Sequence, residues 1–474
     1  MRVFHISAEC YPLAKVGGLG DVVGALPKYQ KLLGINSAVI MPWYDKPFVN
    51  ENEFEKVFES EFKQGSQFYP FAVLKEAKDI LGFEIYLIKI PGLLDRIEVY
   101  GYPDESNQFI AFQHALLHWI SESGLAPDLF HCHDHHSGLI PFFIENCDEF
   151  KILKGIPTLA TVHNGQYQGW MDWHQAILMP TFNSDRWGLL DWDKCINPLA
   201  ALIKCCWAFN TVSTGYLQEL FVEANGLEGL FLSEKEKGYG IINGIDEEIW
   251  DPEADQFLIQ HFNVESLIYG KEKNKEALCK NYGLNHHLPL LVFIGRFAME
   301  KGADLLPAFI QELVLKFSGK INFLVLGSGD LQIQDALSQQ KEQWGQHLAI
   351  VIGYDEKLSH QIYASADFLI MPSRVEPCGL NQLYAMRYGT IPIVRKIGGL
   401  KDTVNDLSKK NANGIVFNDV SLRDMVQAVK RALNLYKDSI AFNELRKRNM
   451  KLDYSWKSSV KKYVQLYENL INRL

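Results

Sequence analysis

The C-terminal half of the chain alternates short apolar runs with longer amphipathic stretches. The apolar runs lie at 290–294, 322–326, 349–352 and 368–371, and the helical patterns that follow them lie at 303–317, 331–344, 357–366 and 379–388. Two more apolar runs, 390–394 and 414–417, are also typical of strands. Strands that alternate with helices of about ten residues or more predict a parallel sheet with helices on both faces.

The N-terminal half repeats this pattern. Buried strands are predicted at 3–7, 38–41, 84–88, 129–133 and 158–162, and a tryptophan-rich stretch at 166–193 is typical of loop insertions. The fold class that follows is α/β. We expect two Rossmann-like parallel-sheet domains that face each other across a deep cleft.

The domain boundary is predicted at Asn243-Gly244, because Asn-Gly is a turn signal and Trp250-Asp251-Pro252 then breaks regular structure. This gives an N-terminal domain over 1–244 and a C-terminal domain over 245–454. The segment 455–474 is predicted to be one helix, with Ser455 as its N-cap, that packs back on the N-terminal domain. Apolar side chains at helical spacing give it a buried face: Val460, Tyr463, Val464, Tyr467, Leu470, Ile471 and Leu474.

The composition is that of an ordinary globular protein. Of the 474 residues, 47% are apolar and 22% are charged, which excludes a disordered, collagenous or coiled-coil chain. With 57 acidic against 47 basic side chains the net charge is −10. Binding to nucleic acid or to an anionic membrane needs a positive face, so neither is expected as a partner, whereas a local cationic pocket for a small anion is compatible with this charge.

The cysteines and the N-terminus predict a cytoplasmic protein. Eight cysteines are scattered without a CxxC pair, which indicates free thiols in a reducing compartment. The apolar stretch at the N-terminus is too short for a signal peptide and runs into Glu9. No apolar run approaches the ~18 residues that a membrane span needs.

Candidate ligand-binding motifs follow two predicted strands, where ligands bind in open α/β sheets. Lys15-Val16-Gly17-Gly18 and then Asp21 follow the first strand, and such glycines let a backbone approach an anion, although a tight turn without a ligand fits as well. Gly295-Arg296 and Lys301 follow the strand at 290–294. Two cations at a helix start are typical of a diphosphate clamp; the alternative is that Arg296 pairs with a surface acid and Lys301 is solvated.

Glu376 follows the strand at 368–371 and precedes Pro377-Cys378-Gly379. A carboxylate beside the backbone N–H groups of Cys378 and Gly379 suits a ligand rich in hydroxyl groups, such as a sugar. The alternative is that Glu376 only caps the following helix.

The run His131-Cys132-His133-Asp134-His135-His136 follows another strand. On a strand, 131, 133 and 135 would face one way and 132, 134 and 136 the other, which splits the candidate ligands of a metal. Catalytic zinc usually takes three protein ligands, so we predict no metal and favour a hydrogen-bonding site for a polar ligand over plain packing. His163-Asn164 ends a further strand at the same rim. Together these groups indicate a nucleotide-sugar site.

In this order along essentially the whole chain, the motifs resemble those of the bacterial glycogen and starch synthases, retaining glycosyltransferases of family 5 with the GT-B fold. The most specific are Pro372 to Leu383 and Gly398 to Val404. The resemblance implies transfer of glucose from ADP-glucose to the nonreducing 4-hydroxyl of an α-1,4-glucan, such as glycogen or a maltooligosaccharide, with release of ADP and without a cofactor.

The resemblance also implies roles for single residues. Glu376, His163, Lys301 and Arg296 are the expected catalytic residues. The expected donor-binding residues are Lys15, Gly18, Asp134, Asn243, Arg296, Lys301, Tyr354, Cys378 and Gly379, and Asp21 and Asn164 are expected on the acceptor side. Arg296 and Lys301 would hold the diphosphate, Tyr354 would stack on the base, and Lys15 with Gly18 would help to bind the distal phosphate.

The chain departs from the family pattern at a few positions. His135 stands where the family commonly has Trp, Glu300 stands where it commonly has Gln, and Gly165-Gln166-Tyr167 also differs. The departures at His135 and Glu300 motivate one rival, a catalytically silent glucan-binding or regulatory protein, whereas the departure at 165–167 concerns the acceptor. A second rival is transfer to a small acceptor, as in sucrose-synthase-like proteins. The diphosphate and sugar contacts leave the choice between ADP-glucose and UDP-glucose open.

Overall fold

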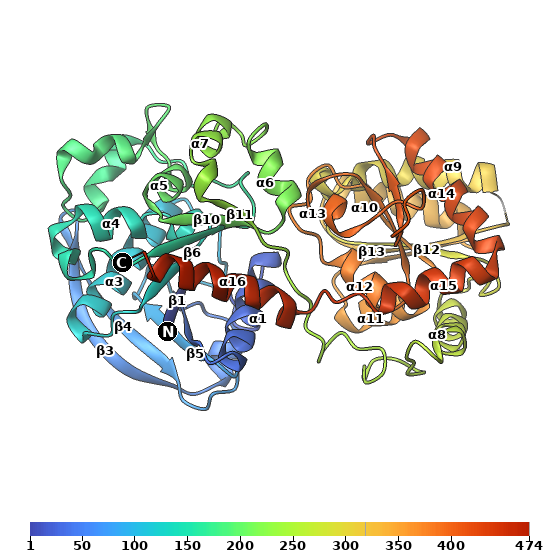
Figure 1. Cartoon of the computed structure of the whole chain (residues 1–474), viewed down its shortest axis with the longest axis horizontal. Coiled ribbons are helices and arrows are strands. Elements are labelled where there is room, and N and C mark those ends of the chain that lie inside the picture. Colours follow the sequence, from blue (N-terminus) through green and yellow to red (C-terminus); the bar gives the residue numbers. More distant parts are fainter. Residues whose placement is uncertain (318, 474) are drawn as a thin grey trace. The chain divides into compact units, whose positions relative to one another are not determined.

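The computed structural model describes residues 1–317 and 319–473, and it divides into two compact units (Figure 1). The N-terminal unit contains Met1–Val212, Leu217–Ile241 and the segment that begins at Trp456. The C-terminal unit contains Ser213–Tyr216 and Ile242–Ser455. Each unit has its own parallel sheet, which confirms the predicted α/β class.

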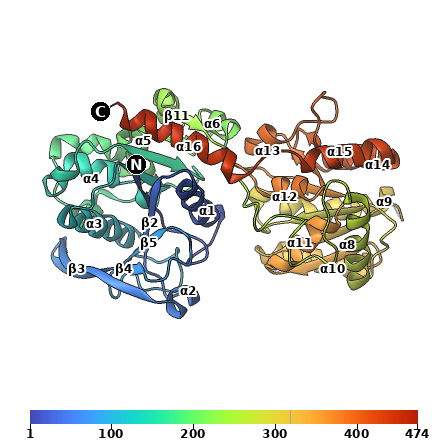
Figure 2. The ribbon, with the colours of Figure 1, turned by 60° about the horizontal axis from the view of Figure 1, so that its bottom comes forward.

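Within the described residues, the sheet of the N-terminal unit has nine strands in the order β11-β10-β7-β6-β1-β2-β5-β4-β3. Their bounds are β1 Arg2–Ile6, β2 Asn36–Pro42, β3 Phe54–Gln64, β4 Gln67–Glu76, β5 Glu84–Lys89, β6 Leu129–His133, β7 Thr158–Val162, β10 Ala208–Thr211 and β11 Gly238–Gly240. All pairs are parallel except β3 with β4 and β4 with β5, so an antiparallel hairpin closes one edge (Figure 2). The tryptophan-rich stretch holds a separate small pair, β8 (Asp191–Trp192) and β9 (Cys195–Ile196).

The helices of this unit connect and cover these strands. They are α1 Gly18–Leu32, α2 Pro47–Glu51, α3 Glu105–Ser123, α4 Ile140–Asn146, α5 Pro198–Cys205, α6 Thr214–Leu220 (its first turn in the C-terminal unit), α7 Glu228–Ser233 and α16 Trp456–Ile471. Helix α16 lies beside α1 and buries Tyr463 and Tyr467 against Val3 and Leu26 (Figure 1). The predicted buried face of this helix is therefore confirmed, except for Leu474, which lies outside the described residues.

The sheet of the C-terminal unit is parallel throughout the described residues, with the order β14-β13-β12-β15-β16-β17. The strand bounds are β12 Leu290–Ile294, β13 Asn322–Gly327, β14 Leu348–Ile352, β15 Phe368–Met371, β16 Ile391–Arg395 and β17 Ile415–Phe417. The helix bounds are α8 Leu267–Tyr282, α9 Leu306–Phe317, α10 Leu331–Trp344, α11 Glu356–Ser365, α12 Asn381–Arg387, α13 Gly398–Thr403, α14 Leu422–Lys437 and α15 Ser439–Met450.

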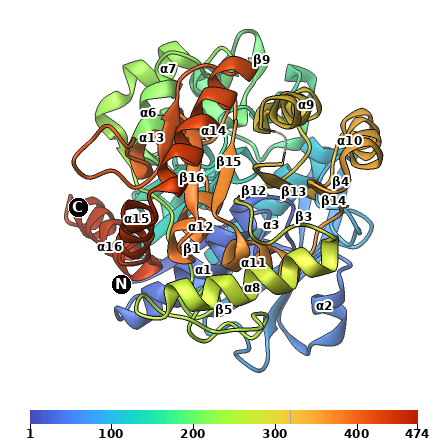
Figure 3. The ribbon, with the colours of Figure 1, turned by 90° about the vertical axis from the view of Figure 1, so that its right-hand side faces the viewer.

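Two apolar layers sandwich this second sheet, as its two-sided burial requires. On one face, α9, α10, α14 and α15 pack against side chains such as Phe323 and Ile370. On the other face, α8, α11, α12 and α13 pack against side chains such as Leu324 and Leu369 (Figure 3). Neighbouring positions of one strand thus pack into opposite apolar layers. The polar candidate residues lie in the loops at the carboxyl ends of the strands.

Each sheet has a switch point, where the strand order reverses along the chain. In the N-terminal unit it lies between β1 and β6, and in the C-terminal unit between β12 and β15. Ligands of open α/β sheets bind at the carboxyl ends of the strands beside this point, because the two following loops diverge there. The candidates that follow these same strands include Lys15, Asp134, Arg296, Lys301 and Glu376. Other candidates follow other strands: His163 and Asn164 follow β7, Asn243 follows β11 and Tyr354 follows β14.

Two expectations about the whole chain can be compared with the coordinates. Among the described residues, no helix combines the length and the apolar character needed to cross a membrane. All eight cysteines are free thiols, as predicted, and six of them are buried.

Candidate active site

The loops after β12 and β15 are fastened to each other at the switch point of the C-terminal unit. The backbone N–H groups of Arg374 and Val375 donate to the carbonyl oxygen of Glu300 at 2.7 and 3.1 Å. Gly302 has φ +69°, and a Cβ there would lie 2.2 Å from the carbonyl oxygen of Pro372. Only glycine allows this approach, and it brings the predicted cation loop against the predicted sugar loop.

Lys301 and Glu376 meet where these two loops converge. The Nζ of Lys301 lies 2.8 Å from Oε1 of Glu376, and the hydroxyl of Ser373 donates to Oε2 at 2.9 Å. All three line a pocket of about 160 Å³ that also includes Gly295 and Asn381. The alternative of a solvated Lys301 is therefore wrong, and an ammonium and a carboxylate face one small polar hollow.

Arg296 pairs with Glu300, the residue that departs from the family pattern. More than half of the Arg296 side chain is exposed, whereas Glu300 is largely covered. The partner is thus an acid of its own loop. In this arrangement each of the two candidate diphosphate-binding cations already contacts a carboxylate.

The other candidates of this unit differ in their surroundings. Cys378 is buried, which raises the pKa of its thiol to about 12, so the thiol stays protonated. Among the described residues, the backbone N–H groups of Cys378 and Gly379 donate no hydrogen bond, and no described group donates a hydrogen bond to the buried Oδ1 of Asn243. Helix α12 begins only at Asn381, two residues later than the predicted helix at 379. Tyr354 follows β14 and is 74% exposed.

In the N-terminal unit, the glycine loop after β1 is held by a residue that the sequence did not single out. Oε2 of Glu9 accepts the backbone N–H groups of Val16 and Gly17 at 2.6 and 3.0 Å, and Oε1 accepts the hydroxyl of Tyr100 at 2.7 Å. The available signal was a carboxylate right after a buried strand. The motif predicts a helix from Val22, but helix α1 already begins at Gly18, so Gly18 and Asp21 belong to its first turn.

Lys15 and Asp21 form an ion pair at 2.7 Å. The pair joins the loop to the first turn of α1, since Asp21 belongs to that turn. Lys15 also lies 5.5 Å from the ring centre of Tyr11. The residue expected at the distal phosphate and the one expected on the acceptor side are thus direct neighbours.

Asp134 and His163 form the second polar group of this unit, beyond β6 and β7. The backbone N–H of His163 donates to Oδ1 of Asp134 at 2.7 Å, and both side chains are buried. Burial raises the pKa of Asp134 to about 7 in spite of this hydrogen bond. Asn164 accepts the N–H of Gln166 at 3.0 Å and shapes the following turn.

One detail of the histidine-run prediction is wrong. The alternation holds only to His133, because β6 ends there, Asp134 takes φ +56°, and a 3-10 turn begins at His135. His135 instead packs on Gly169, where a Cβ would lie 2.5 Å from its ring.

Two groups of described residues could approach a cation: His5 with His131 and His133, and Glu105 with His135 and His136. In the first group every ring nitrogen has a hydrogen-bond partner in the protein. A cation there would have to displace those bonds.

Comparisons with known proteins agree along the whole chain. Residues 2–233 match the family model described as starch synthase catalytic domain, and residues 274–449 match glycosyl transferases group 1. The glycogen synthase of Flavobacterium johnsoniae is 48% identical over 473 residues and is covered, like this chain, over 100% of its length. The catalytic domain of starch synthase IV from Arabidopsis thaliana, solved with ADP and acarbose, superposes with a TM-score of 0.89 at 33% identity over 99% of both chains.

A more distant likeness concerns the fold alone. Sucrose-phosphate synthase from Thermosynechococcus elongatus covers 100% of both chains with a TM-score of 0.62 at 15% identity.

Proposed function

Because the chain belongs to the glycogen and starch synthase family of glycosyltransferases, with the GT-B fold, we propose that it transfers glucose from ADP-glucose to the nonreducing 4-hydroxyl of an α-1,4-glucan and releases ADP. The donor class is a nucleotide-sugar and the acceptor class is a glucan. The finer assignments, ADP as the nucleotide and a glycogen or maltooligosaccharide chain as the acceptor, are part of the proposal.

The observation that carries the proposal is the pairing of Lys301 with Glu376 at the switch point of the C-terminal unit, 2.8 Å apart. A leaving nucleoside diphosphate develops negative charge while the sugar gains oxocarbenium character. A cation held against the diphosphate stabilises that transition state more than the ground state. A carboxylate next to this cation can accept hydrogen bonds from the hydroxyl groups of the sugar. The two members of one ion pair would thus bind the two parts of the donor, Lys301 the diphosphate and Glu376 the glucose.

Arg296 would supply a planar two-point contact to the diphosphate. Its present partner, Glu300, is an exchangeable carboxylate of the same loop, so the diphosphate would replace one anion with another. The backbone N–H groups of Cys378 and Gly379 and the uncommitted Oδ1 of Asn243 would serve the glucose hydroxyls. Tyr354, exposed after β14, would stack on the base.

We assign Asp134 and His163 of the N-terminal unit to the glucose, and Lys15 and Gly18 to the distal phosphate. Asp21 and Asn164 are assigned to the acceptor. Retention of configuration is proposed to occur by departure and attack on the same face, with the leaving phosphate taking the acceptor proton. That route needs positioned cations and hydrogen bonds rather than a protein nucleophile.

The kinetic test replaces Lys301 with Ala and measures ADP release with ADP-glucose and maltotetraose. Removing one electrostatic contact of this kind is expected to lower kcat by ~10²–10³. The matched control is Lys316→Ala, because Lys316 is an exposed lysine of the same unit whose partner is Glu312. Wild-type turnover in Lys301→Ala, with its fold intact by circular dichroism, would contradict the proposal.

Product analysis separates the rivals. ADP-glucose and UDP-glucose are offered together with a labelled maltooligosaccharide, and the product is sized. A ladder of longer glucans with ADP as the main nucleotide released supports the proposal. A disaccharide product would favour transfer to a small acceptor, and glucan binding without donor consumption would favour the silent protein.

A further inference from the structure

His163 is the end of a buried chain of hydrogen bonds. Its Nε2 lies 3.0 Å from Nδ1 of His133, and Nε2 of His133 lies 3.0 Å from Nδ1 of His5. Nε2 of His5 lies 2.8 Å from Oε1 of Gln30, on helix α1. Three imidazoles from β1, β6 and the end of β7 thus link the candidate sugar site to the helix layer behind the sheet.

A second branch fixes the direction in which these bonds donate. Nδ2 of Asn210 donates to the carbonyl oxygen of Thr211 at 3.4 Å, so Oδ1 of Asn210 accepts the hydroxyl of Thr161 at 2.7 Å. The Thr161 oxygen then accepts Nε2–H of His131 at 2.6 Å. A neutral His131 has one ring proton, so its Nδ1 accepts the hydroxyl of Tyr467 at 2.8 Å.

The two branches join at Gln30. Because the hydroxyl proton of Tyr467 points to His131, the Tyr467 oxygen accepts Nε2–H of Gln30 at 2.8 Å. The amide oxygen of Gln30 therefore faces His5, and it also accepts the hydroxyl of Ser37 at 2.5 Å. An amide oxygen only accepts, so His5 carries its proton on Nε2.

All four histidines of the two branches are neutral near pH 7. Burial lowers the pKa of His5 to about 4 and that of His163 to about 3. Burial, together with the neighbouring imidazoles, lowers the pKa of His131 and His133 well below the usual value. Each ring therefore has one N–H and one bare nitrogen. The tautomer of one imidazole determines the tautomer of the imidazole that is hydrogen-bonded to it.

We propose that Gln30, His5 and His133 are positioning residues that fix His163 as the tautomer with its proton on Nε2 and a bare Nδ1. His5 accepts on Nδ1, so His133 donates from Nε2 and accepts on Nδ1, and His163 must donate from Nε2. Among the described residues nothing hydrogen-bonds to Nδ1 of His163. That nitrogen is a hydrogen-bond acceptor for a hydroxyl group of the donor sugar, an assignment that rests on the proposed function.

The direct test is the tautomer of His163 in the unmodified protein. Long-range 1H–15N correlation spectra of the full-length chain with 15N-labelled histidine distinguish protonated from bare ring nitrogens, and the His163→Gln spectrum assigns the signals. The expected result is a protonated Nε2 and a bare Nδ1 at pH 7. A protonated Nδ1 would overturn the proposal. This NMR measurement of the tautomer needs no substrate. Its result is therefore independent of whether the protein transfers glucose, and a failure of the tautomer proposal can be told apart from a failure of the proposed function.

Two pairs of variants test the series of hydrogen bonds that leads from Gln30 through His5 and His133 to His163. Gln at 133 offers one acceptor and one donor, whereas Phe breaks the chain. Losing one hydrogen bond of about 1.4 kcal/mol predicts that His133→Phe lowers kcat ~10-fold and His133→Gln less than ~3-fold. Gln30→Glu keeps an acceptor for His5, whereas Gln30→Met releases it and should give mixed tautomers at His163.

His114→Gln is the control. His114 is also buried in this unit, but its partner is Glu149, and neither residue belongs to the hydrogen-bond network that ends at His163. This variant is expected to leave the His163 tautomer and kcat unchanged. Equal losses in both members of a pair, or an unchanged His163 spectrum in Gln30→Met, would overturn the proposal. If His133→Phe does not fold, the Gln30 pair and the spectrum of the unmodified protein decide the question.

Discussion

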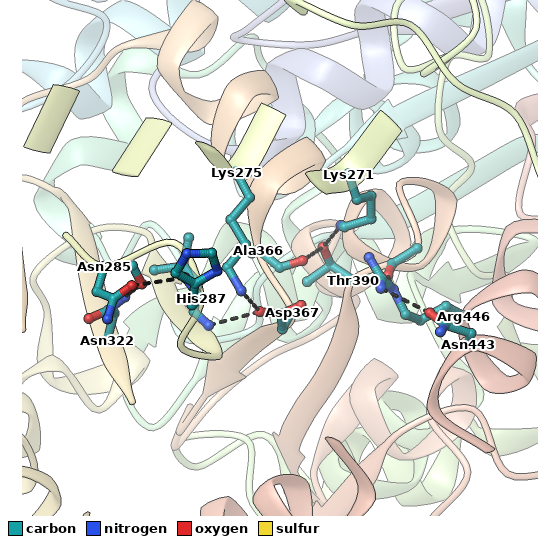
Figure 4. Close-up of polar contacts among 12 residues, drawn as sticks. Lys271, Lys275, Asn285, His287, Asn322, Ala366, Asp367, Thr390, Asn443 and Arg446 are labelled. Carbon is teal, nitrogen blue, oxygen red and sulfur yellow. Dashed lines mark hydrogen bonds and ion pairs between the residues drawn. The ribbon is translucent and has the colours of Figure 1, made fainter. Parts of the chain in front are cut away.

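The two units satisfy their buried polar groups in opposite ways. Behind the strand ends of the N-terminal unit, neutral imidazole, amide and hydroxyl groups donate and accept hydrogen bonds in one directed network that includes His131, Gln30 and Tyr467. In the C-terminal unit the buried polar groups include a cluster of formal charges. Figure 4 shows Lys271 and Lys275, both on helix α8, reaching toward Thr390 and Asp367.

The charged cluster is held by complete coordination. Nζ of Lys271 donates to the carbonyl oxygens of Tyr363 and Tyr388 and to the hydroxyl of Thr390 at 2.6–3.0 Å, which occupies all three protons of an ammonium. Lys275 pairs with Asp367 at 2.6 Å. Burial lowers the pKa of Lys271, whereas in Asp367 the neighbouring cations outweigh burial and hold the pKa below its usual value.

The two units are therefore expected to lose stability in response to different changes. A neutral network has direction but little electrostatic strength, so it can orient a site residue and is sensitive to protonation. A buried charged pair is insensitive to mild acid but costs much when one partner is removed. The directed network adjoins the candidate sugar site, whereas the charged cluster fastens α8 to the residues that immediately precede β15 and β16.

The largest expected effect is acid unfolding of the N-terminal unit before the C-terminal one. Six of its histidines have pKa values lowered by burial: His5, His131, His133, His135, His136 and His163. The unfolded chain binds protons near pH 6.5 and the folded unit does not, so stability falls as the pH drops below 6.5. Six groups at ~1.4 kcal/mol per pH unit would lower the stability by about 8 kcal/mol per unit. Asp134, whose pKa burial raises to about 7, binds a proton first in the folded unit and offsets about 1.4 kcal/mol of this, which leaves about 7 kcal/mol per unit.

Hydrogen exchange by mass spectrometry between pH 7.5 and 5, corrected for intrinsic rates, measures this loss unit by unit. Peptides from β1, β6 and β7 should lose protection first. The Lys275–Asp367 pair keeps its charges over this range because the pKa of Asp367 lies below 3.8. Simultaneous loss of protection in both units would contradict the comparison.

A middle-sized effect is expected from Asp367→Asn. It leaves the buried charge of Lys275 unpaired, and such a loss typically costs ~3–5 kcal/mol. The counterpart in the neutral network is Thr161→Val, which removes one acceptor and one donor and should cost ~1–3 kcal/mol. Urea unfolding of both variants at pH 7 checks the order, and a larger loss for Thr161→Val would reverse it.

The smallest effect is expected from Glu300→Gln. More than half of the Arg296 side chain is exposed, so its ion pair with Glu300 is screened by solvent and worth about 1 kcal/mol or less. Releasing Arg296 should therefore lower the donor KM by no more than ~5-fold, with the gain fading as salt is added. Initial rates at 20 mM and 300 mM salt (about a fourfold change in Debye length) measure it. A raised donor KM would show that Glu300 supports donor binding.

The apolar pattern predicted most of the parallel strands, because a strand buried on both faces reads as a continuous apolar run. It did not predict the short parallel strands β10 and β11. It missed the hairpin Phe54–Gln64 and Gln67–Glu76, whose exposed face interrupts the apolar pattern with charged residues. The amphipathic helix Leu422–Lys437 was also not predicted, although the helix at 455–474 was recognised from the same kind of one-sided apolar stripe.

The site was predictable where chemistry sits at a strand end, as for Lys301 and Glu376, and not where it depends on contacts distant in sequence. Tyr467 was predicted as part of an apolar face, and its ring is indeed buried, but its hydroxyl contacts His131, which lies 336 residues earlier in the chain. The pairing of Arg296 with Glu300 was open for a different reason: several loop conformations are compatible with i and i+4 charges outside a helix.

The central claim is that Arg296 and Lys301 bind the diphosphate of the donor at the switch point of the C-terminal unit. A crystal structure of the protein with ADP tests it most directly. We expect diphosphate oxygens within hydrogen-bond distance of both cations, with Glu300 turned away from Arg296. A nucleotide bound elsewhere, with Arg296 still on Glu300 and Lys301 still on Glu376, would contradict it.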